Sequence, residues 1–384
     1  MLSDMNDETM HRSLIGRSGG RRELNTPVLV IDVEVLERNI ARMARLAKQH
    51  GLGLRPHVKT HKSVEIGRLQ RDAGATGFCC AKLGEAEVMA DGGIVDGLLL
   101  TSPVVSDGAI RRLIELNART SGLMCVVDHP ENVKALGEAA RAAGKSLRVL
   151  IDIDPGIHRT GVTSPEAAVD LLQEICAQQS LIYSGVQFYC GREQHIEGYA
   201  DRRAVIQQRT DSLQIVIEAL KEQGGAPSII TGGGTGTHRI DTELGILTEL
   251  QVGSYIFMDS QYAACDITGS DEPPYEFALM VDVRVISANS AGMRTVDAGY
   301  KALATDGGIP RVLAGMAPET EYLFMGDEHG LLTSSAELLP RIGERVILTA
   351  PHCDPTVNLY DFYHVVRGDT LVAIWPVDAR GRSR

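Results

Sequence analysis

The stretch RPHVKTHK, residues 55–62, carries the end of the first of eight strand candidates. Amphipathic helical patterns flank these candidates, most clearly at 35–47, 131–143, 165–177 and 202–223. Eight repeats of a strand followed by a helix predict the α/β class and a (β/α)8 barrel. The strand candidates are 53–57, 77–80, 97–100, 123–127, 147–152, 183–187, 228–231 and 250–253.

An open doubly wound sheet is the alternative, but no GxGxxG sequence follows the first strand candidate. After about residue 270 long helical periodicity ends, and strand candidates follow at 277–286, 293–297, 345–348, 362–367 and 370–375. We therefore expect an N-terminal arm and strand at 1–32, a barrel at 33–270 and a β domain at 271–384. The strand 27–31 should join the β domain, and the turn at 271–274 is the expected boundary.

The chain has 384 residues, which is enough for one large domain and a smaller one. Its net charge of −12 argues against a nucleic acid or an anionic membrane as partner, because no basic excess is available to neutralise phosphates. No apolar run approaches the roughly 18 residues that span a bilayer. Hydrophobic residues make up 43% and charged residues 23%, which is ordinary for a soluble globular protein.

The N-terminal 24 residues are polar and lack a secretory signal core, so we expect a loose arm or one that drapes over a dimer partner. The cysteines show no CxxC repeat, and most lie in apolar runs, where cysteine is a small buried side chain. This usage fits the reducing cytoplasm. The seven cysteines are at positions 79, 80, 125, 176, 190, 265 and 353.

Lys59 follows the first strand candidate, at the barrel end where catalytic side chains gather. We expect the like charges of Arg55, His57, His61 and Lys62, together with partial burial, to lower its pKa. A neutral lysine amine can bond covalently to an aldehyde cofactor. The alternative is a solvated basic turn.

The segment TGGGTGT, residues 231–237, follows the seventh strand candidate. Glycines let backbone N–H groups converge on an anion, and hydroxyls such as that of Thr231 add donors. Barrels often hold phosphate in the loops after strands seven and eight, and the next such loop is Gly253-Ser254-Tyr255. The pattern predicts a phosphate site rather than a flexible loop.

Three further side chains are candidates for the same end of the barrel. Tyr189 follows the sixth strand candidate and either faces a flat ring or belongs to the core. Arg159 follows the fifth and either contacts a cofactor or carboxylate or lies at the surface. His195 lies on the loop beyond Tyr189, where exposure to solvent is the commoner outcome.

The segment PHCDPT, residues 351–356, contains two potential metal ligands. On an extended segment His352 and Asp354 project to the same side, and Cys353 points away. A carboxylate oxygen favours Mn²⁺ or Mg²⁺, with Zn²⁺ also possible, and two protein ligands leave positions open for water or a substrate hydroxyl. A single His-x-Asp also occurs often by chance.

These motifs, taken in order, resemble those of the D-threonine aldolase and D-serine dehydratase family, which has the alanine racemase-like fold and uses pyridoxal phosphate. The resemblance covers nearly the whole chain and is closest to the D-threonine aldolases. Its motifs are RPHVKTHK at 55, RTGV at 159, QFYCGREQH at 187, TGGGTGT at 231, ELQVGSYIFMDSQY at 249, GDEHG at 326 and HCDPTVNLYD at 352.

The resemblance implies that Lys59 holds the cofactor covalently, that Arg159 and Tyr189 line its ring, and that His195 stands near the substrate's β-hydroxyl. It also implies a homodimer in which the β domain of one subunit packs near the barrel of its mate. The phosphate would lie at Gly233, Gly234, Gly253, Ser254 and Tyr255, and the metal at His352 and Asp354.

The implied reaction is cleavage of D-3-hydroxy amino acids such as D-threonine to glycine and an aldehyde. Asp354 fits the aldolases, because dehydratases of this group have cysteine at that position. Cys190 and Gln261 depart from the usual aldolase pattern of a histidine and an acidic residue there. Alternatives are a 3-hydroxy-D-aspartate aldolase, a D-serine or 3-hydroxy-D-aspartate dehydratase that releases a keto acid and ammonia, a racemase, or a non-catalytic pyridoxal phosphate carrier.

Overall fold

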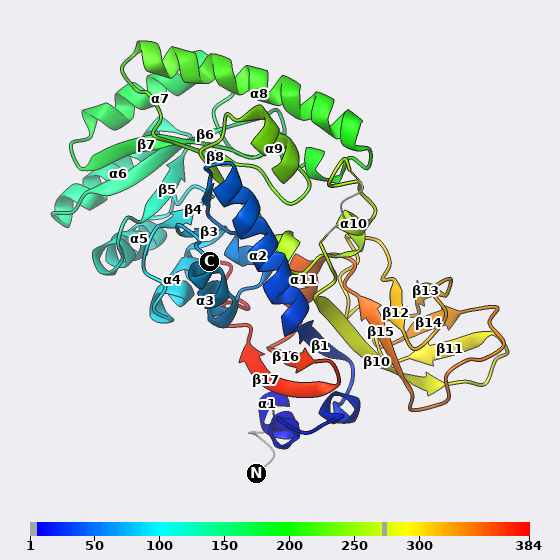
Figure 1. Ribbon diagram of the computed structural model, residues 1–384. Helices are drawn as coiled ribbons and strands as arrows, with labels where there is room; N and C mark the ends of the chain where they lie inside the picture. Colours follow the sequence, from blue (N-terminus) through cyan, green and yellow to red (C-terminus); the bar gives the residue numbers. More distant parts are fainter. Residues whose placement is uncertain (1–5, 271–274) are drawn as a thin grey trace.

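The computed structural model describes residues 6–270 and 275–384. An eight-stranded parallel sheet runs in the order β2-β9-β8-β7-β6-β5-β4-β3 (Figure 1). A parallel bridge between His57 and Cys79 joins its two edges and closes the barrel. The predicted barrel is confirmed, with strands β2 (Gly53–Leu54), β3 (Phe78–Cys80), β4 (Leu98–Leu100), β5 (Met124–Val127), β6 (Leu147–Ile153), β7 (Leu181–Phe188), β8 (Ile229–Gly232) and β9 (Glu249–Leu250).

Helices pack around the outside of this barrel and begin where the sequence carries start signals. Ser164 caps α7, because its Oγ accepts a hydrogen bond from the Ala167 N–H at 3.2 Å, and Pro165 occupies the first helical position. The helices are α2 (Val33–Gln49), α3 (Val64–Asp72), α4 (Leu83–Asp91), α5 (Asp107–Arg119), α6 (Pro130–Ala142), α7 (Pro165–Ala177), α8 (Tyr199–Glu222) and α9 (His238–Leu244).

The second sheet follows the path β13-β14-β11-β10-β1-β16-β17, and β15 pairs with both β10 and β12. Its first strand, β1, lies between β10 and β16, so residues from both ends of the chain meet in one sheet. The expected boundary at 271–274 lies outside the described residues. The strands are β1 (Val28–Asp32), β10 (Leu279–Ser287), β11 (Met293–Val296), β12 (Val312–Ala314), β13 (Glu321–Phe324), β14 (Gly330–Thr333), β15 (Arg345–Thr349), β16 (Phe362–Arg367) and β17 (Thr370–Pro376).

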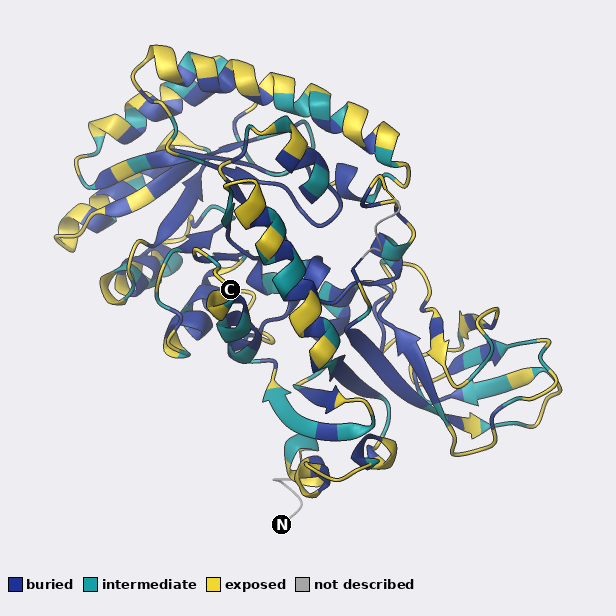
Figure 2. Ribbon diagram, viewed as in Figure 1, coloured by how far each residue is buried: buried dark blue, intermediate teal, exposed yellow. Residues whose placement is uncertain are grey.

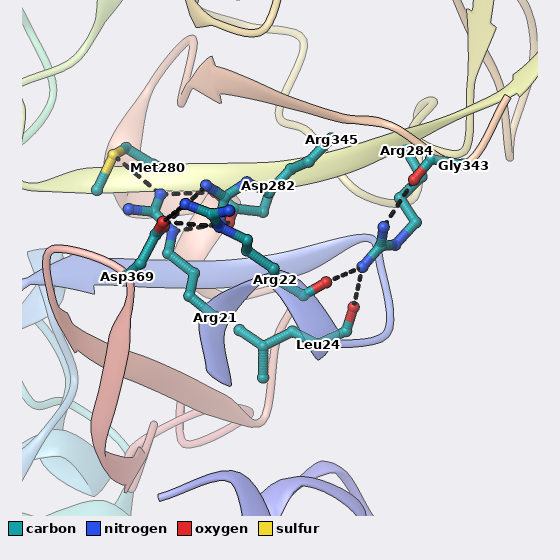
Figure 3. A network of polar contacts seen from close by, with 9 residues as sticks. All are labelled: Arg21, Arg22, Leu24, Met280, Asp282, Arg284, Gly343, Arg345 and Asp369. Atoms are coloured by element: carbon teal, nitrogen blue, oxygen red, sulfur yellow. Dashed lines mark hydrogen bonds and ion pairs between the residues drawn. The ribbon is translucent and has the colours of Figure 1, made fainter. Parts of the chain in front are cut away.

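The described part of the N-terminal arm is folded, so the first of the two predicted alternatives, a loose arm, is wrong; that the arm drapes over a dimer partner stays a prediction. It forms α1 (Asp7–His11) and the 3-10 turns η1 (Arg12–Leu14) and η2 (Gly20–Glu23). Arg21 donates two hydrogen bonds to Asp282, at 2.9 and 2.8 Å, and both side chains are buried (Figure 3). Arg345 also contacts Asp282, so this carboxylate anchors the arm to β10.

Burial follows the two sheets. The barrel strands are buried almost throughout, whereas α8 exposes one face along its length (Figure 2). Among the described residues, no helix has the length and apolarity required to cross a membrane. The largest core cluster extends from barrel strands into β10 and β15, so the barrel and the β domain share one hydrophobic core.

A single buried carboxylate ties the barrel to the segment that follows β15. Asp259 accepts hydrogen bonds from the backbone N–H of Tyr262 at 3.0 Å and from that of Cys353 at 3.0 Å. Tyr262 lies in α10 (Ser260–Ala263), and Cys353 opens the short helix α11 (Cys353–Val357). The backbone N–H of Ser260 also donates to the carbonyl of Ala350. Asp259 therefore positions α11 against the barrel.

Candidate active site

A cavity of about 190 Å³ lies at the carboxyl ends of the barrel strands. Its walls come from loops after most of the strands, as expected for a barrel site. The lining residues are His57, Lys59, Thr60, Ala81, Thr101, Ser102, Arg159, Gln187, Tyr189, Gly234, Thr235, Gln251, Gly253, Ser254 and Tyr262. The structure thus brings together Lys59, Arg159, Tyr189 and the two predicted phosphate loops.

Lys59 lies in the 3-10 turn η3 (Val58–Thr60), and its Nζ forms an ion pair with Asp354 Oδ2. Burial lowers the pKa of Lys59, but the charge of Asp354 outweighs it and raises the pKa overall. The prediction that neighbouring like charges lower this pKa is therefore wrong for the protein without a cofactor.

The basic neighbours of Lys59 are neutral or paired with acids. Burial lowers the pKa of His57 to about 3 and that of His61 to about 4, so both imidazoles are neutral at pH 7. Arg55 forms a buried ion pair with Glu249 at 2.7 Å. Lys62 donates to Asn358 Oδ1 and lies 3.6 Å from Glu85. Of this basic run, Lys59 therefore lines the cavity as a cation, and its charge is paired with Asp354.

The glycine-rich loop and the loop after β9 form a cradle of backbone donors. Among the described residues, no acceptor is found for the backbone N–H groups of Thr235, Gly253 and Ser254. A Cβ on Gly253 would lie 2.5 Å from Thr60 Oγ1, so only glycine fits there. Three unsatisfied N–H groups around one end of a cavity suit an anion such as phosphate.

Three of the predicted phosphate residues do not line this cavity. The Thr231 hydroxyl lies in β8 and accepts a hydrogen bond from Gln251 Nε2 at 3.1 Å. Gly233 lines a separate small cavity behind the loop, with a φ of +70° that favours glycine. The Tyr255 side chain is fully buried and accepts from Gln70, while its backbone N–H donates to Thr235 Oγ1. These three residues therefore lie outside the cavity wall and pack against the loops that form the cradle.

Arg159 and Tyr189 lie together at the open side of the cavity. The guanidinium carbon of Arg159 is 5.6 Å from the centre of the Tyr189 ring. Burial raises the pKa of the Tyr189 hydroxyl, which therefore stays protonated at neutral pH. Both side chains are placed to contact a flat ring or an anion in the cavity.

His195 ends the short 3-10 turn η4 (Glu193–His195), and its ring lies 4.6 Å from that of Tyr262. Its Nδ1 is buried and has no hydrogen-bond partner in the described part of the chain. Burial lowers the pKa of His195, and the charges of His352 and Lys59 lower it further. A neutral imidazole beside the cavity can accept a proton.

His352 and Asp354 do not lie on an extended segment, so the predicted reason for their proximity is wrong. His352 caps α11, and Asp354 lies in its first turn. His352 Nδ1 contacts Asp306 Oδ2 at 2.7 Å, which leaves Nε2 available to a ligand. Cys353 is fully buried, with Sγ 3.5 Å from Asp354 Oδ1. No cluster of three or more His, Cys, Asp or Glu side chains suited to a metal occurs in the described ranges.

Sequence reasoning missed several polar residues of the cavity. Gln187 donates to Asp152 at 2.9 Å and accepts from Gln251 at 3.1 Å, so the two amides cross the barrel interior. His57 contacts Thr101 Oγ1 at 3.2 Å. Each of these residues lies at or just after the end of a strand, a position that would have identified them.

Comparison with known proteins agrees with this geometry. Residues 31–261 match the alanine racemase N-terminal domain, and residues 278–366 match a putative serine dehydratase domain. A 3-hydroxy-D-aspartate aldolase of Paracoccus denitrificans (strain Pd 1222) is 37% identical, over 94% of this chain and 93% of the relative. A D-threonine aldolase of Arthrobacter sp. is 34% identical, over 94% of each chain.

Among solved structures, the D-threonine aldolase from Filomicrobium marinum superposes with a TM-score of 0.89 at 37% identity. That match covers 94% of this chain and 97% of the other. Because both the barrel and the β domain are matched, the likeness extends beyond the barrel alone. The chain therefore belongs to the alanine racemase-like family, in the group of D-threonine aldolase and D-serine dehydratase.

Proposed function

We propose that the protein is a pyridoxal phosphate- and divalent metal-dependent aldolase that cleaves D-3-hydroxy amino acids of the D-threonine type to glycine and an aldehyde. The contact between Lys59 Nζ and Asp354 carries this proposal. It joins a lysine that lines the cavity to a potential metal ligand of the β domain. The relatives named as aldolases support the same reaction class.

The cavity fits pyridoxal phosphate, the cofactor of this family. Lys59 would bond its aldehyde, and the free N–H groups of Thr235, Gly253 and Ser254 would hold its phosphate. Thr231, Gly233, Gly234 and Tyr255 would shape that cradle. When bound, the cofactor supplies a ring that delocalises the electrons of a broken bond to Cα.

His352 and Asp354 also suit a divalent ion. They offer one nitrogen and hard carboxylate oxygen, a donor set that favours Mn²⁺, with Mg²⁺ or Zn²⁺ as alternatives. Asp306 holds the His352 ring in the tautomer that presents Nε2, as carboxylates commonly do beside metal sites. An ion held there would supply positive charge that makes a nearby hydroxyl more acidic.

His195 would accept the proton of the substrate's β-hydroxyl. Its lowered pKa keeps the imidazole neutral at pH 7, and Tyr262 supports the ring from one side. Arg159 and Tyr189 would orient the cofactor ring and close the open side of the cavity to water. Loss of the hydroxyl proton leads to cleavage between Cα and Cβ.

Product analysis tests this proposal. The protein is incubated with pyridoxal phosphate, Mn²⁺ and either D-threonine, 3-hydroxy-D-aspartate or D-serine. Glycine together with acetaldehyde from D-threonine is the expected result. Release of glycine and glyoxylate from 3-hydroxy-D-aspartate alone would make this acidic amino acid the substrate. Absence of glycine with all three substrates would overturn the aldolase assignment.

Elimination is the second candidate, favoured by the match of residues 278–366 to a putative serine dehydratase domain. It would release a keto acid and ammonia, which the same incubation distinguishes from glycine and an aldehyde. Asp354 favours the aldolase, because a carboxylate stands where the dehydratases of the group have cysteine.

We also propose that the enzyme is a cytoplasmic homodimer. All seven cysteines lie within the described residues and are unpaired, as expected in a reducing compartment. The β domain exposes large apolar side chains, which suit a subunit interface. They include Ile309, Leu323, Met325, Leu338 and Ile342. A protein that light scattering shows to be monomeric and that is fully active in the aldolase assay would contradict the dimer.

A further inference from the structure

One buried side chain links the glycine-rich loop to the segment that carries His195. Gln194 is fully buried and directly precedes His195. Its Nε2 donates to Thr237 Oγ1 at 3.0 Å and to the Cys190 carbonyl at 3.1 Å. Its Oε1 accepts from the backbone N–H of Gly236 at 2.9 Å. Both ends of the amide are therefore used, and they connect two loops that are far apart in sequence.

The glycine-rich loop and the segment that carries Gln194 are in direct van der Waals contact. A Cβ on Gly236 would lie 2.1 Å from the Gln194 backbone oxygen, and one on Gly234 would lie 2.5 Å from Gln194 Oε1. The first distance, to a backbone oxygen, is too short for any side chain at Gly236, and the second would require the Gln194 amide to move. The approach of Gln194 therefore requires glycine at residue 236 and favours it at residue 234, in addition to any need of a bound anion.

The Thr237 hydroxyl extends this connection into the loop. It accepts from the backbone N–H of Gly234 at 3.1 Å and donates to the buried carboxylate of Asp241 at 2.7 Å. Gly234 directly precedes Thr235, whose backbone N–H group finds no acceptor within residues 6–270 and 275–384. A shift of the loop on binding an anion would thus change the hydrogen bonds of Gln194.

Few contacts hold the imidazole of His195: its ring lies 4.6 Å from that of Tyr262, and among the described residues its Nδ1 has no hydrogen-bond partner. The turn η4 that contains it is only three residues long. Arg202 holds the other side of this segment by donating to the Ile196 carbonyl, but it also contacts Asp266 rather than the glycine-rich loop. Gln194 is therefore the direct link from His195 to the anion cradle.

We propose that Gln194 is a positioning residue that couples the glycine-rich loop to His195, so that an anion held in the cradle also fixes the imidazole. The proposal rests on the proposed function, because it takes the cradle as the phosphate site and His195 as the base. In this arrangement an anion that restrains the glycine-rich loop also restrains the segment that carries the imidazole.

Hydrogen exchange tests the coupling. Exchange is measured in residues 190–196 and 232–238, with the protein saturated by pyridoxal phosphate or by pyridoxal, which lacks the phosphate. In the wild type, omission of the phosphate should speed exchange several-fold in both segments. In Gln194→Met, which keeps the side-chain length but removes its hydrogen bonds, only residues 232–238 should respond. Gln214→Met is the matched control, because Gln214 is exposed on α8 and, within the described part of the chain, its side chain hydrogen-bonds only to Glu218.

Gln194→Glu is a second variant that keeps the acceptor for Gly236 but loses both donors, and it should also uncouple the segments. With D-threonine, either variant should lower kcat about tenfold and leave KM nearly unchanged, because His195 is misplaced while substrate binding persists. An equal response of residues 190–196 in wild type and in both variants would overturn the coupling. If residues 232–238 of the wild type do not respond to the phosphate, the anion site itself is wrong, and the coupling falls with it.

Discussion

The barrel and the β domain both contribute residues to the candidate active site, but different features of the fold position them. The barrel contributes side chains from many strands, because parallel strands all end at the same rim (Figure 1). The β domain contributes through one segment, His352 to Asp354, whose place depends on how α11 docks against α10. Topology therefore positions the barrel residues, whereas docking positions the proposed metal ligands. Each of the following variants tests one side of this comparison.

The largest effect should come from Lys59 on the barrel side. Lys59→Ala removes the amine that bonds the cofactor, and we expect kcat for D-threonine to fall by at least about 10⁴-fold. Pyridoxal phosphate should bind weakly and without the yellow colour that borohydride bleaches in the wild type. The control is Lys301→Ala, which breaks exposed ion pairs with Asp327 and Glu328 and should leave the rate unchanged. A colourless wild type in excess cofactor would contradict the role of Lys59.

The next effect concerns the proposed metal ligands on the β-domain side. Asp354→Asn should lower kcat by about 10²-fold or more, because the amide is a poorer ligand for a hard cation. A chelator should do the same to the wild type without removing the cofactor colour, and Mn²⁺ should restore only the wild type. Asp361→Asn is the control, since Asp361 pairs with Arg380 at the surface. Full activity of the chelated wild type would exclude a metal from the reaction.

The docking itself is tested at Asp259. The asparagine in Asp259→Asn has only one acceptor oxygen for the backbone N–H groups of Tyr262 and Cys353. One of the two elements should therefore loosen, and we expect about tenfold weaker Mn²⁺ affinity with near-normal binding of pyridoxal phosphate. Titration of each component separates the two affinities. Equal weakening of both would show that the barrel and the β domain are not positioned independently.

The smallest effect on catalysis should come from the arm. Arg21→Met leaves the buried Asp282 with Arg345 alone, and we expect the free energy of unfolding to fall by about 3 kcal/mol. Arg22→Met breaks an exposed contact with Asp369 and should cost at most about 1 kcal/mol (Figure 3). Urea unfolding measures both values. If Arg21→Met instead lowers kcat at unchanged stability, the arm contributes to the site.

Much of the barrel could be predicted because its signals are local. The helix at 165–177 was predicted to the residue, since Ser164 and Pro165 mark its start. The strands β12, β13 and β14 were missed, because they are three or four residues long and partly exposed and so lack a continuous apolar run. The barrel rim was predictable because parallel strands place their ends together.

The effect of a charged residue far away in the sequence could not be predicted from the neighbours of Lys59 in the chain. The pKa of Lys59 depends on Asp354, which lies 295 positions away. Likewise, the periodicity of His352 and Asp354 suggested an extended segment, whereas the chain turns into α11 there. Pro355 falls in the first turn of that helix, where its missing N–H group needs no partner, and this was the available signal.

The two hydrogen bonds that Asp259 accepts, one from the barrel and one from the β domain, have a consequence for chimeras made from two family members. The carboxylate belongs to the barrel, but one of its two acceptor oxygens serves a backbone N–H group of the β domain. A chimera that joins this barrel to the β domain of another family member takes the acceptor, Asp259, from one parent and the donor, the backbone N–H group of residue 353, from the other. Because the β domain supplies only a backbone N–H group, the exchange requires an acceptor at residue 259 of the barrel parent and no particular side chain at residue 353 of the other parent, proline excepted. In an evolving lineage, residue 259 would restrict which barrels can accept a foreign β domain.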